Sequence, residues 1–312
     1  MTLTADFYQP QRAEEWNALV ATARNATFLL DRRYMDYHSD RFADCSLMFC
    51  QGDRLVAALP ACVKGDVVSC HAGLTYGPLI VSAAADHATV HECMAMACDV
   101  FRQRGARTLL YKPIPYIYID GCADDDLYEM FRLNARLKAR ALSTAVCLQS
   151  PLPMRTLRAR GMRKALRNGL TVNTESDVTE FWQLLRDVLT ERHGVQPVHT
   201  AAEMQLLGSR FPTNIRLYTV RDGARLMGGE WVFFTPRVAH AQYIAASDEG
   251  RAKGALDLLF CHLMEHECGT QKWLDFGIST EDGGRTLNNG LLWQKEGFGG
   301  RGVCYDQYEI EL

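Results

Sequence analysis

The chain has 312 residues, of which 47% are hydrophobic and 23% charged, and its formal net charge is −3. This length favours two domains, and the charge gives no global attraction to nucleic acid or membrane, so a polyanion would need a local basic patch. Eleven cysteines without a CxxC pair argue against a disulfide scaffold or zinc ribbon. With no signal-peptide pattern and no apolar run of membrane-spanning length, we expect a cytoplasmic protein with free thiols and no transmembrane segment.

The first half of the sequence predicts two helices, then strands, a long helix and further strands. Trp16 and Leu19 share one face of a helix expected over 13–24, and Asp31 is placed to cap a second helix over 31–42. The elements expected after it are strands over 46–50, 55–63 and 67–70, an extended stretch over 73–80, a helix over 86–104, a strand over 108–112, a helix over 127–140 and a strand over 145–148.

The second half repeats this order. We expect strands over 215–220, 226–234 and 238–246, a glycine-containing loop over 247–254, a helix over 255–267 and a strand over 272–276. The two runs superpose without a gap across two turns, so that Gly52 falls on Gly223 and Val67 on Val238. The shared order of elements predicts an internal duplication of one α/β unit.

The predicted fold class is therefore α/β (mixed α+β), with two tandem domains. Hairpin strands followed by a helix and another strand predict, in each domain, a mixed, largely antiparallel sheet flanked by helices. We place the domains at residues 1–150 and 151–312, and we expect the terminal strand to be able to pack back on the first domain.

A basic stretch opens the second domain. Between 155 and 167 there are six arginines and lysines and no acidic residue. Because guanidinium groups suit phosphate, Arg163, Lys164 and Arg167 are candidate contacts of a phosphate-bearing ligand, such as a nucleotide-linked sugar or a nucleic-acid end. The alternative is the solvated face of a connecting helix. Helices over 177–192 and 200–208 follow, and Thr200 begins a capping-box pattern.

The segment 250–255 is a candidate anion site. Backbone N–H groups at the start of a helix, a glycine for close approach and two cations suit a pyrophosphate. The alternative is a simple turn with solvated charges. The candidate residues of this site are Arg251, Lys253, Gly254 and Ala255.

Three further polar side chains are candidates for contact with substrate. His240 and Tyr243 lie in the predicted strand 238–246, beside the anion segment, and His240 could act as a base or proton shuttle. A packed, hydrogen-bonded core histidine is the alternative. His199, next to the Thr200 cap, either contacts substrate or satisfies loop hydrogen bonds.

Two short motifs complete the list. Glycines around Lys295 predict a tight loop that presents this lysine to a cleft, and an exposed lysine on a turn is the alternative. His262, Glu265 and His266 match the HxxEH pattern of inverted zincins, but no third ligand is recognisable and leucines share their face, so we expect no metal.

The order of these blocks resembles the Fem-type acyltransferases, which comprise the peptidoglycan aminoacyltransferases and their GNAT-annotated relatives. The likeness rests on the duplication, on the linker Arg163-Lys164-Ala165-Leu166-Arg167-Asn168-Gly169-Leu170, on the strand at 243–247, and on Lys295-Glu296-Gly297-Phe298-Gly299, and it covers nearly the whole chain. Two departures are the missing heptad-patterned helical arm and Leu256, where the GNAT pyrophosphate loop usually has a small residue.

The resemblance implies two GNAT domains that transfer an acyl or aminoacyl group to an amine. It implies acyl-CoA or aminoacyl-tRNA as co-substrate, with no tightly bound cofactor. Lys295 would lie near the donor ester and phosphates, and Arg163 with Lys164 near the phosphates of the acceptor. The base would be His240, or a water ordered by Glu230 or Asp275.

We therefore predict an N-acyltransferase that acts on a cell-envelope or polysaccharide precursor. The expected partners are a small-molecule acceptor or a nucleotide- or lipid-linked sugar, with tRNA and peripheral membrane contact as further options. The oligomeric state stays open. We expect the second copy to carry the chemistry. One alternative is a non-catalytic module that binds a phosphorylated ligand or a protein, and a more remote one is a zinc peptidase.

Overall fold

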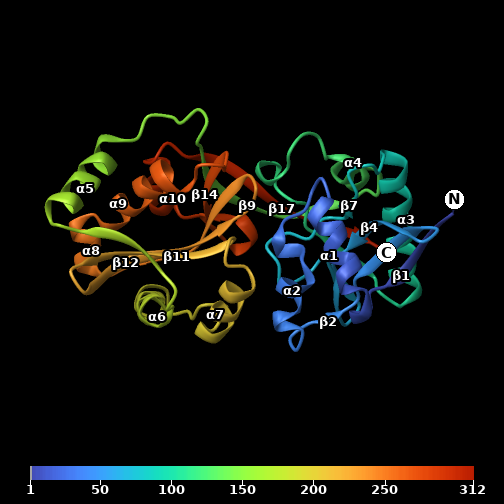
Figure 1. Ribbon diagram of the computed structural model, residues 1–312. Coiled ribbons are helices and arrows are strands. Elements are labelled where there is room, and N and C mark those ends of the chain that lie inside the picture. Colours follow the sequence, from blue (N-terminus) through green and yellow to red (C-terminus); the bar gives the residue numbers. More distant parts are fainter. Residues whose placement is uncertain (1) are drawn as a thin grey trace. The chain divides into compact units, whose positions relative to one another are not determined.

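The computed structural model describes residues 2–312, except for the side chain of His193, and it divides into two compact units (Figure 1). The first unit comprises the chain up to Leu142 together with Thr280–Thr286 and Cys304–Leu312, and the second comprises Ser143–Ser279 and Leu287–Val303. The predicted boundary between residues 150 and 151 falls inside the second unit. No helix in the described part of the chain is long and apolar enough to cross a membrane.

The first unit contains a four-stranded sheet of order β1-β3-β4-β7 and a second set of strands in the order β9-β17-β8-β6-β5-β2. Helix α3 packs against β1, and its face formed by Val90, Met94, Ala97 and Phe101 is buried, as the periodicity predicted. The elements are β1 (Leu3–Phe7), α1 (Ala13–Thr22), α2 (Arg32–Met35), β2 (Ala43–Asp44), β3 (Leu47–Gln51), β4 (Arg54–Leu59), β5 (Cys62–Lys64), β6 (Val67–Ser69), β7 (Ile80–Val81), α3 (His87–Gln103), β8 (Thr108–Tyr111) and α4 (Asp125–Arg132), with parts of β9 (Arg136–Cys147) and β17 (Arg301–Glu311).

Three predicted elements of this unit are wrong in extent. The helix expected over 31–42 is the short α2 followed by a 3₁₀ turn, although Asp31 does cap it by accepting a hydrogen bond from the Arg33 N–H. The helix expected over 127–140 ends at Arg132. Beyond it, Arg136 and Arg140 alternate along β9 and pair with acidic residues of β17, which favours strand. The strand expected over 55–63 breaks at Pro60, which has no N–H to donate.

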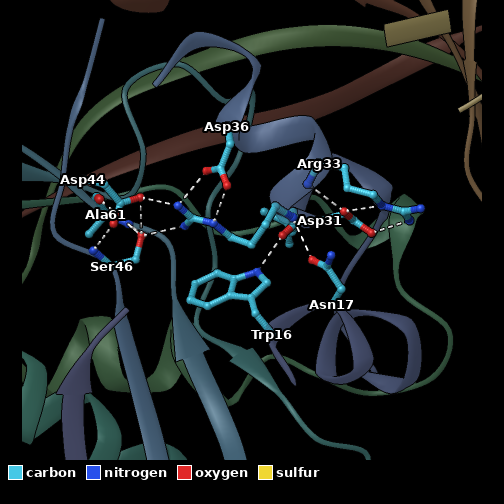
Figure 2. A network of polar contacts seen from close by, with 10 residues as sticks. Trp16, Asn17, Asp31, Arg33, Asp36, Asp44, Ser46 and Ala61 are labelled. Carbon is cyan, nitrogen blue, oxygen red and sulfur yellow. Dashed lines mark hydrogen bonds and ion pairs between the residues drawn. The ribbon is translucent and has the colours of Figure 1, made fainter. Parts of the chain in front are cut away.

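A buried arginine is the centre of a polar network that also contains Asp36, Asp44, Ser46 and Ala61 (Figure 2). Arg32 is only 3% exposed, and its guanidinium contacts Asp36 and Asp44 at 2.7 and 2.8 Å and lies 3.6 Å from the ring centre of Tyr8. The Ser46 Oγ accepts from the backbone N–H of Ala61 at 3.0 Å, beside the Pro60 break. A buried cation with two carboxylates on it is stable only as a complete set.

The second unit is a sheet of order β10-β11-β12-β13-β14-β9 with helices on both faces. Helix α9 contacts β11 and β12 on one face, and α6 contacts β12 and β13 on the other (Figure 1). The elements are α5 (Thr156–Arg167), β10 (Thr171–Glu175), α6 (Thr179–His193), α7 (Ala201–Arg210), β11 (Ile215–Asp222), β12 (Arg225–Phe234), β13 (Val238–Ala246), α8 (Asp248–Lys253), α9 (Ala255–His262), β14 (Trp273–Ile278) and α10 (Asn289–Glu296).

Two segments of the second unit differ from expectation. The loop predicted over 247–254 is mostly helix α8, because the Ser247 hydroxyl caps it by accepting from the Gly250 N–H. The helix predicted over 255–267 ends as α9 at His262 and continues as one π-helical turn, Leu263–Glu267. The capping box at Thr200 is present as predicted.

The two units repeat one order of elements, in agreement with the aligned sequence. Each contains a strand, two helices and a hairpin in this order (β1, α1, α2 and β3–β4 in the first, β10, α6, α7 and β11–β12 in the second), and each later pairs two strands in parallel across a helical connection. In the first unit Val67 pairs with Thr108, and in the second Val238 pairs with Trp273, so the predicted match of Val67 with Val238 holds in the register of the sheets.

Candidate active site

The second unit has an opening between β13 and β14. These parallel strands pair at three positions only, of which the last joins His240 to Asp275, and they separate beyond that pair. On its other side β13 stays paired with β12 as far as Ala246. In β14, Gly277 has φ of +74°, which glycine adopts without strain, and the pairing of β14 with β9 shifts register there. The opening is therefore built into the strands and does not depend on a mobile loop.

A cavity of about 560 Å³ lies at this opening. The separated ends of the two strands form part of its wall, through Ile244, Ala245 and Ala246 of β13 and Phe276 of β14. Phe276, Phe260 and Phe298 pack edge to face or tilted, with ring centres 4.8 to 5.5 Å apart, and make an apolar wall. Such a space suits a flexible, mostly apolar chain.

Three arginines add positive charge to the cavity wall. Arg192 and Arg251 both contact Asp248, at 2.8 and 2.6 Å, and Arg158 contacts Asp257 at 2.7 Å. Two cations that share one exposed carboxylate keep charge available for a second anion. The cavity thus combines an apolar wall with guanidinium groups.

The predicted residues His240 and Asp275 are in direct contact. The His240 Nδ1 lies 2.8 Å from an Asp275 Oδ, and Asp275 is fully buried. Asp275 also accepts hydrogen bonds from the Ser143 hydroxyl and from the Gly277 N–H at 3.3 Å. With Nδ1 facing a carboxylate, the imidazole keeps Nε2 as its proton acceptor, and His240 is 14% exposed in its side chain.

Lys295 lies in the cavity wall, on helix α10. Its Nζ donates to the carbonyl oxygens of Gly277 and Ile278 at 2.7 and 2.8 Å, which ties α10 to the end of β14. Burial lowers the pKa of Lys295 to about 8, against a smaller opposite effect of Asp275. The loop expected around Lys295 begins only after α10, because the Asn288 side chain caps that helix.

Glu230 lies apart from this pair. It is fully buried in β12, no hydrogen-bond partner is present for either oxygen among the described residues, and burial raises its pKa well above the usual value. Its neighbours across the sheet are Tyr218 and Ile244. Burial therefore favours the neutral form of this carboxyl group, and its role in ordering a water stays a prediction.

Tyr243 and His199 form their own pair. The Tyr243 hydroxyl lies 2.7 Å from His199 Nδ1, and the Tyr243 ring packs edge to face on Trp182 of α6. Because β13 has a bulge after Ala241, Tyr243 faces the same side of the sheet as His240, opposite α9.

The candidate anion residues separate on α8 and α9. Arg251 and Gly254 line the cavity, whereas Lys253 binds Asp222 and Glu249 at 2.7 and 2.9 Å and Ala255 is buried. Lys253 and Arg251 are two positions apart on a helix, so their side chains point to different sides.

The basic residues Arg163, Lys164 and Arg167 are exposed on α5 and do not line the cavity. In the HxxEH motif, the His262 and His266 rings lie 5.0 Å apart, and Glu265 contacts His266 at 3.8 Å. Among residues 2–312, no group of three or more candidate ligands gathers in a geometry that would hold a metal ion.

Residues 154–282, less than half of the chain, match the family model of the acetyltransferase (GNAT) domain. This segment contains β13, β14 and the His240–Asp275 pair. The second unit therefore carries a segment that is similar to a GNAT acetyltransferase domain. A search among curated proteins found no match.

Solved structures share the fold of this chain at low sequence identity. The crystal structure of FemX has a TM-score of 0.69 at 12% identity, covering 100% of this chain and 98% of its own. The C-terminal domain of a putative lysylphosphatidylglycerol synthetase from Agrobacterium fabrum has a TM-score of 0.63 at 13% identity, with 96% and 91% covered. A tandem GNAT protein from the clavulanic acid biosynthesis pathway has 0.53 at 15%, with 99% and 98% covered. The resemblance to the Fem-type fold is confirmed.

Sequence reasoning missed several residues of this candidate site. Ser143 hydrogen-bonds Asp275, and Phe260 with Phe298 forms the apolar wall. Ser143 lies in β9 but outside the shorter strand predicted over 145–148, so its place beside β14 was not apparent. The phenylalanines had no signal that distinguishes a cavity wall from an ordinary core.

Proposed function

We propose that the second unit transfers an acyl group from acyl-CoA to an amine, with the thioester held at the opening between β13 and β14. The observation that carries this proposal is that β13 and β14 separate directly after the His240–Asp275 pair and that their separated ends line the cavity. The pair itself lies outside the cavity lining, so the thioester would have to reach it through the opening between the strands. The apolar wall suits the pantetheine arm, and Arg158, Arg192 and Arg251 suit the phosphates of the donor.

The transfer uses groups already in place. His240 Nε2 takes a proton from the attacking amine, whose nitrogen forms the new bond to the thioester carbonyl carbon. Asp275 holds the imidazole in orientation and stabilises its charged form. The C–S bond breaks, and the proton passes to the leaving thiolate. No protein nucleophile takes part, because alignment of the two substrates supplies most of the rate gain.

We assign Lys295 as the hydrogen-bond donor to the carbonyl oxygen of the thioester. A charged ammonium has three N–H groups, and the Gly277 and Ile278 carbonyls accept two of them. The third is free to stabilise the developing oxyanion. Since the pKa of Lys295 is lowered to about 8, this group is mostly charged at neutral pH and loses the third N–H above pH 8.

We further propose that the amine belongs to a cell-envelope or polysaccharide precursor. Its support is that one structure of the same fold is named as a lysylphosphatidylglycerol synthetase domain, together with the shape of the Fem-type fold. On the α6 side of the sheet, the Tyr243–His199 pair lies next to His240 and is the contact that we assign to the acceptor.

Release of free thiol from acetyl-CoA, measured with a panel of amino sugars and amino acids free or linked to nucleotides, tests this function. We expect thiol release with at least one amine, and a rate that falls above pH 8 unless Lys295 is changed to arginine, which keeps its charge. Transfer from charged tRNA and none from acyl-CoA would contradict the donor assignment. Absence of transfer from both would favour a non-catalytic module.

A further inference from the structure

The basic residues at the start of the second unit form a surface that the proposed reaction does not use. Helix α5 packs against α9 through Ala165 and Gly161, where a Cβ at Gly161 would lie 1.8 Å from Asp257. Arg158 turns inward from the same helix face to bind Asp257. One side of α5 is therefore fixed to the protein, and the opposite side faces solvent.

Four cations gather on the outer side of α5. Arg160, Arg163, Lys164 and Arg167 are separated by helix spacings of three and four, so they form a single stripe about two turns long that ends at the last residue of the helix. All four side chains are exposed, and no ion pair involves them among residues 2–312. In contrast, Arg155 is paired with Glu296, and Arg158 is paired with Asp257. We call these four residues the cationic stripe.

Leucines border the cationic stripe on both sides. Leu157 is 50% exposed and Leu166 is 54% exposed, and helical spacing puts one on each flank of the stripe. At the first turn of α5, the Arg155 guanidinium stacks 4.9 Å from the ring of Trp293, which is itself 49% exposed. Exposed leucines and a tryptophan beside cations are the side chains that gain from a lipid headgroup region.

We propose that the cationic stripe docks this protein on an anionic membrane surface. The charge of the stripe is complementary to anionic lipid headgroups, which attract each nearby lysine or arginine. The bordering leucines favour a bilayer over a nucleic acid, because a phosphate backbone offers no apolar partner for them. This docking does not depend on the acyl transfer.

One consequence rests on the proposed function. Arg158, on the inner side of α5, lines the catalytic cavity. A helix with its side chains is about 10 Å across, so docking through the outer side would bring the cavity within about that distance of the headgroups. An acceptor carried on a lipid would then reach the site without leaving the surface.

Co-sedimentation of the full chain with vesicles tests the docking without any assay of activity. The vesicles are phosphatidylcholine alone, or phosphatidylcholine with about one third phosphatidylglycerol, and a short RNA duplex serves as the competing polyanion. We expect binding to the anionic vesicles only, weakened by salt. Arg163→Ala with Lys164→Ala should reduce it about 25-fold, or about fivefold per cation.

Two matched variants decide what the surface binds. Arg54→Ala with Lys64→Ala removes the same charge from exposed positions of the first unit and should leave binding unchanged. Leu157→Gln with Leu166→Gln keeps helix formers and should weaken vesicle binding about fivefold or more while RNA binding stays constant.

Three results would overturn the proposal. The first is no binding to anionic vesicles by the unaltered chain. The second is binding that the stripe variant does not weaken. The third is vesicle binding that the leucine variant leaves unchanged, since the stripe would then be a site for a polyanion without a bilayer. All the substituted side chains are exposed, so the variants should keep the fold, which circular dichroism checks.

Discussion

The two units differ most at the place where the second one opens. In the second unit, residues 241–244 carry β13 directly from its last parallel pair into the cavity wall. In the first unit, residues 70–79 stand between β6 and β7 at the corresponding place. This longer segment covers the end of β8: the Cys70 N–H donates to Leu110 and the Gly77 N–H to Lys112, at 2.8 and 2.9 Å.

A buried lysine holds residues 70–79 of the first unit, which we call the filling segment, in place. The Lys112 Nζ donates to the carbonyl oxygens of His71 and Leu74, just as Lys295 donates to two carbonyls of β14 in the second unit. Burial lowers the pKa of each lysine to about 8. In both units a buried lysine donates to two backbone carbonyls. In the first unit this fixes residues 70–79, and in the second it fixes the end of β14 beside the opening.

The largest effect is expected when His240 of the second unit is replaced by the residue at the corresponding position of the first unit. The parallel register places Ser69 where the second unit has His240. Changing His240→Ser should lower kcat about 10²- to 10⁴-fold, because the general base is lost. The binding constant of the donor should stay the same. Steady-state kinetics and calorimetric titration measure the two quantities, and a kcat within a factor of two of the unaltered enzyme would remove His240 from the mechanism.

The next effect concerns the Arg32 network, which we find in the first unit. Arg32→Leu leaves Asp36 and Asp44 without their buried cation, so the free energy of unfolding should fall by about 3–5 kcal/mol. Arg33→Leu is the control, since Arg33 is exposed and pairs with Asp31. Denaturant unfolding checks the difference. Equal free energies of unfolding for the two variants would show that the Arg32 network does not stabilise the first unit.

A change of pH tests the filling segment. The pKa of Lys112 lies near 8 in the folded protein and near its ordinary value of 10.5 in the unfolded chain, so between these values the unfolded chain binds the extra proton. Stability conferred through this group therefore rises as pH increases from 8 to 10.5. From pH 8 to pH 10.5, the free energy of unfolding of the unaltered protein should therefore rise by about 3 kcal/mol relative to that of Lys112→Met.

Exposed Lys64→Met is the matched control for this measurement, and it should follow the unaltered protein at every pH. Thermal unfolding at neutral and at alkaline pH gives the comparison. A difference between the Lys112 variant and the unaltered protein that does not change with pH would mean that Lys112 is as hydrated as a surface lysine.

The smallest effect is expected at the capping box of α7, which follows His199. Thr200→Ala removes the hydrogen bond to the Glu203 N–H and should cost about 1 kcal/mol. If the Tyr243–His199 pair contacts the acceptor, the same variant should raise KM for the amine more than it changes kcat. An unchanged KM would separate the pair from substrate binding.

The sequence predicted the order of elements well because hydrophobic periodicity and turn residues are local signals. Strand 238–246 and the Asp31 and Thr200 caps followed from such signals. His240 and Asp275 were named separately, but their contact depends on the register of two strands joined by two helices, which no local pattern encodes. Lys253 was grouped with Arg251 because the glycines around them suggested a loop, and the Ser247 cap makes that segment a helix instead.

The central claim, that only the second unit accepts an acyl donor, is tested by calorimetric titration of acetyl-CoA into the full chain and into Leu256→Trp. Leu256 lines the cavity and is half-buried, so a larger ring there should fill the space without disturbing the core. Lys253→Ala, next to it but outside the cavity, is the control. We expect one site per chain, abolished by Leu256→Trp and kept by Lys253→Ala. Two sites per chain, or one site that Leu256→Trp leaves intact, would contradict the account.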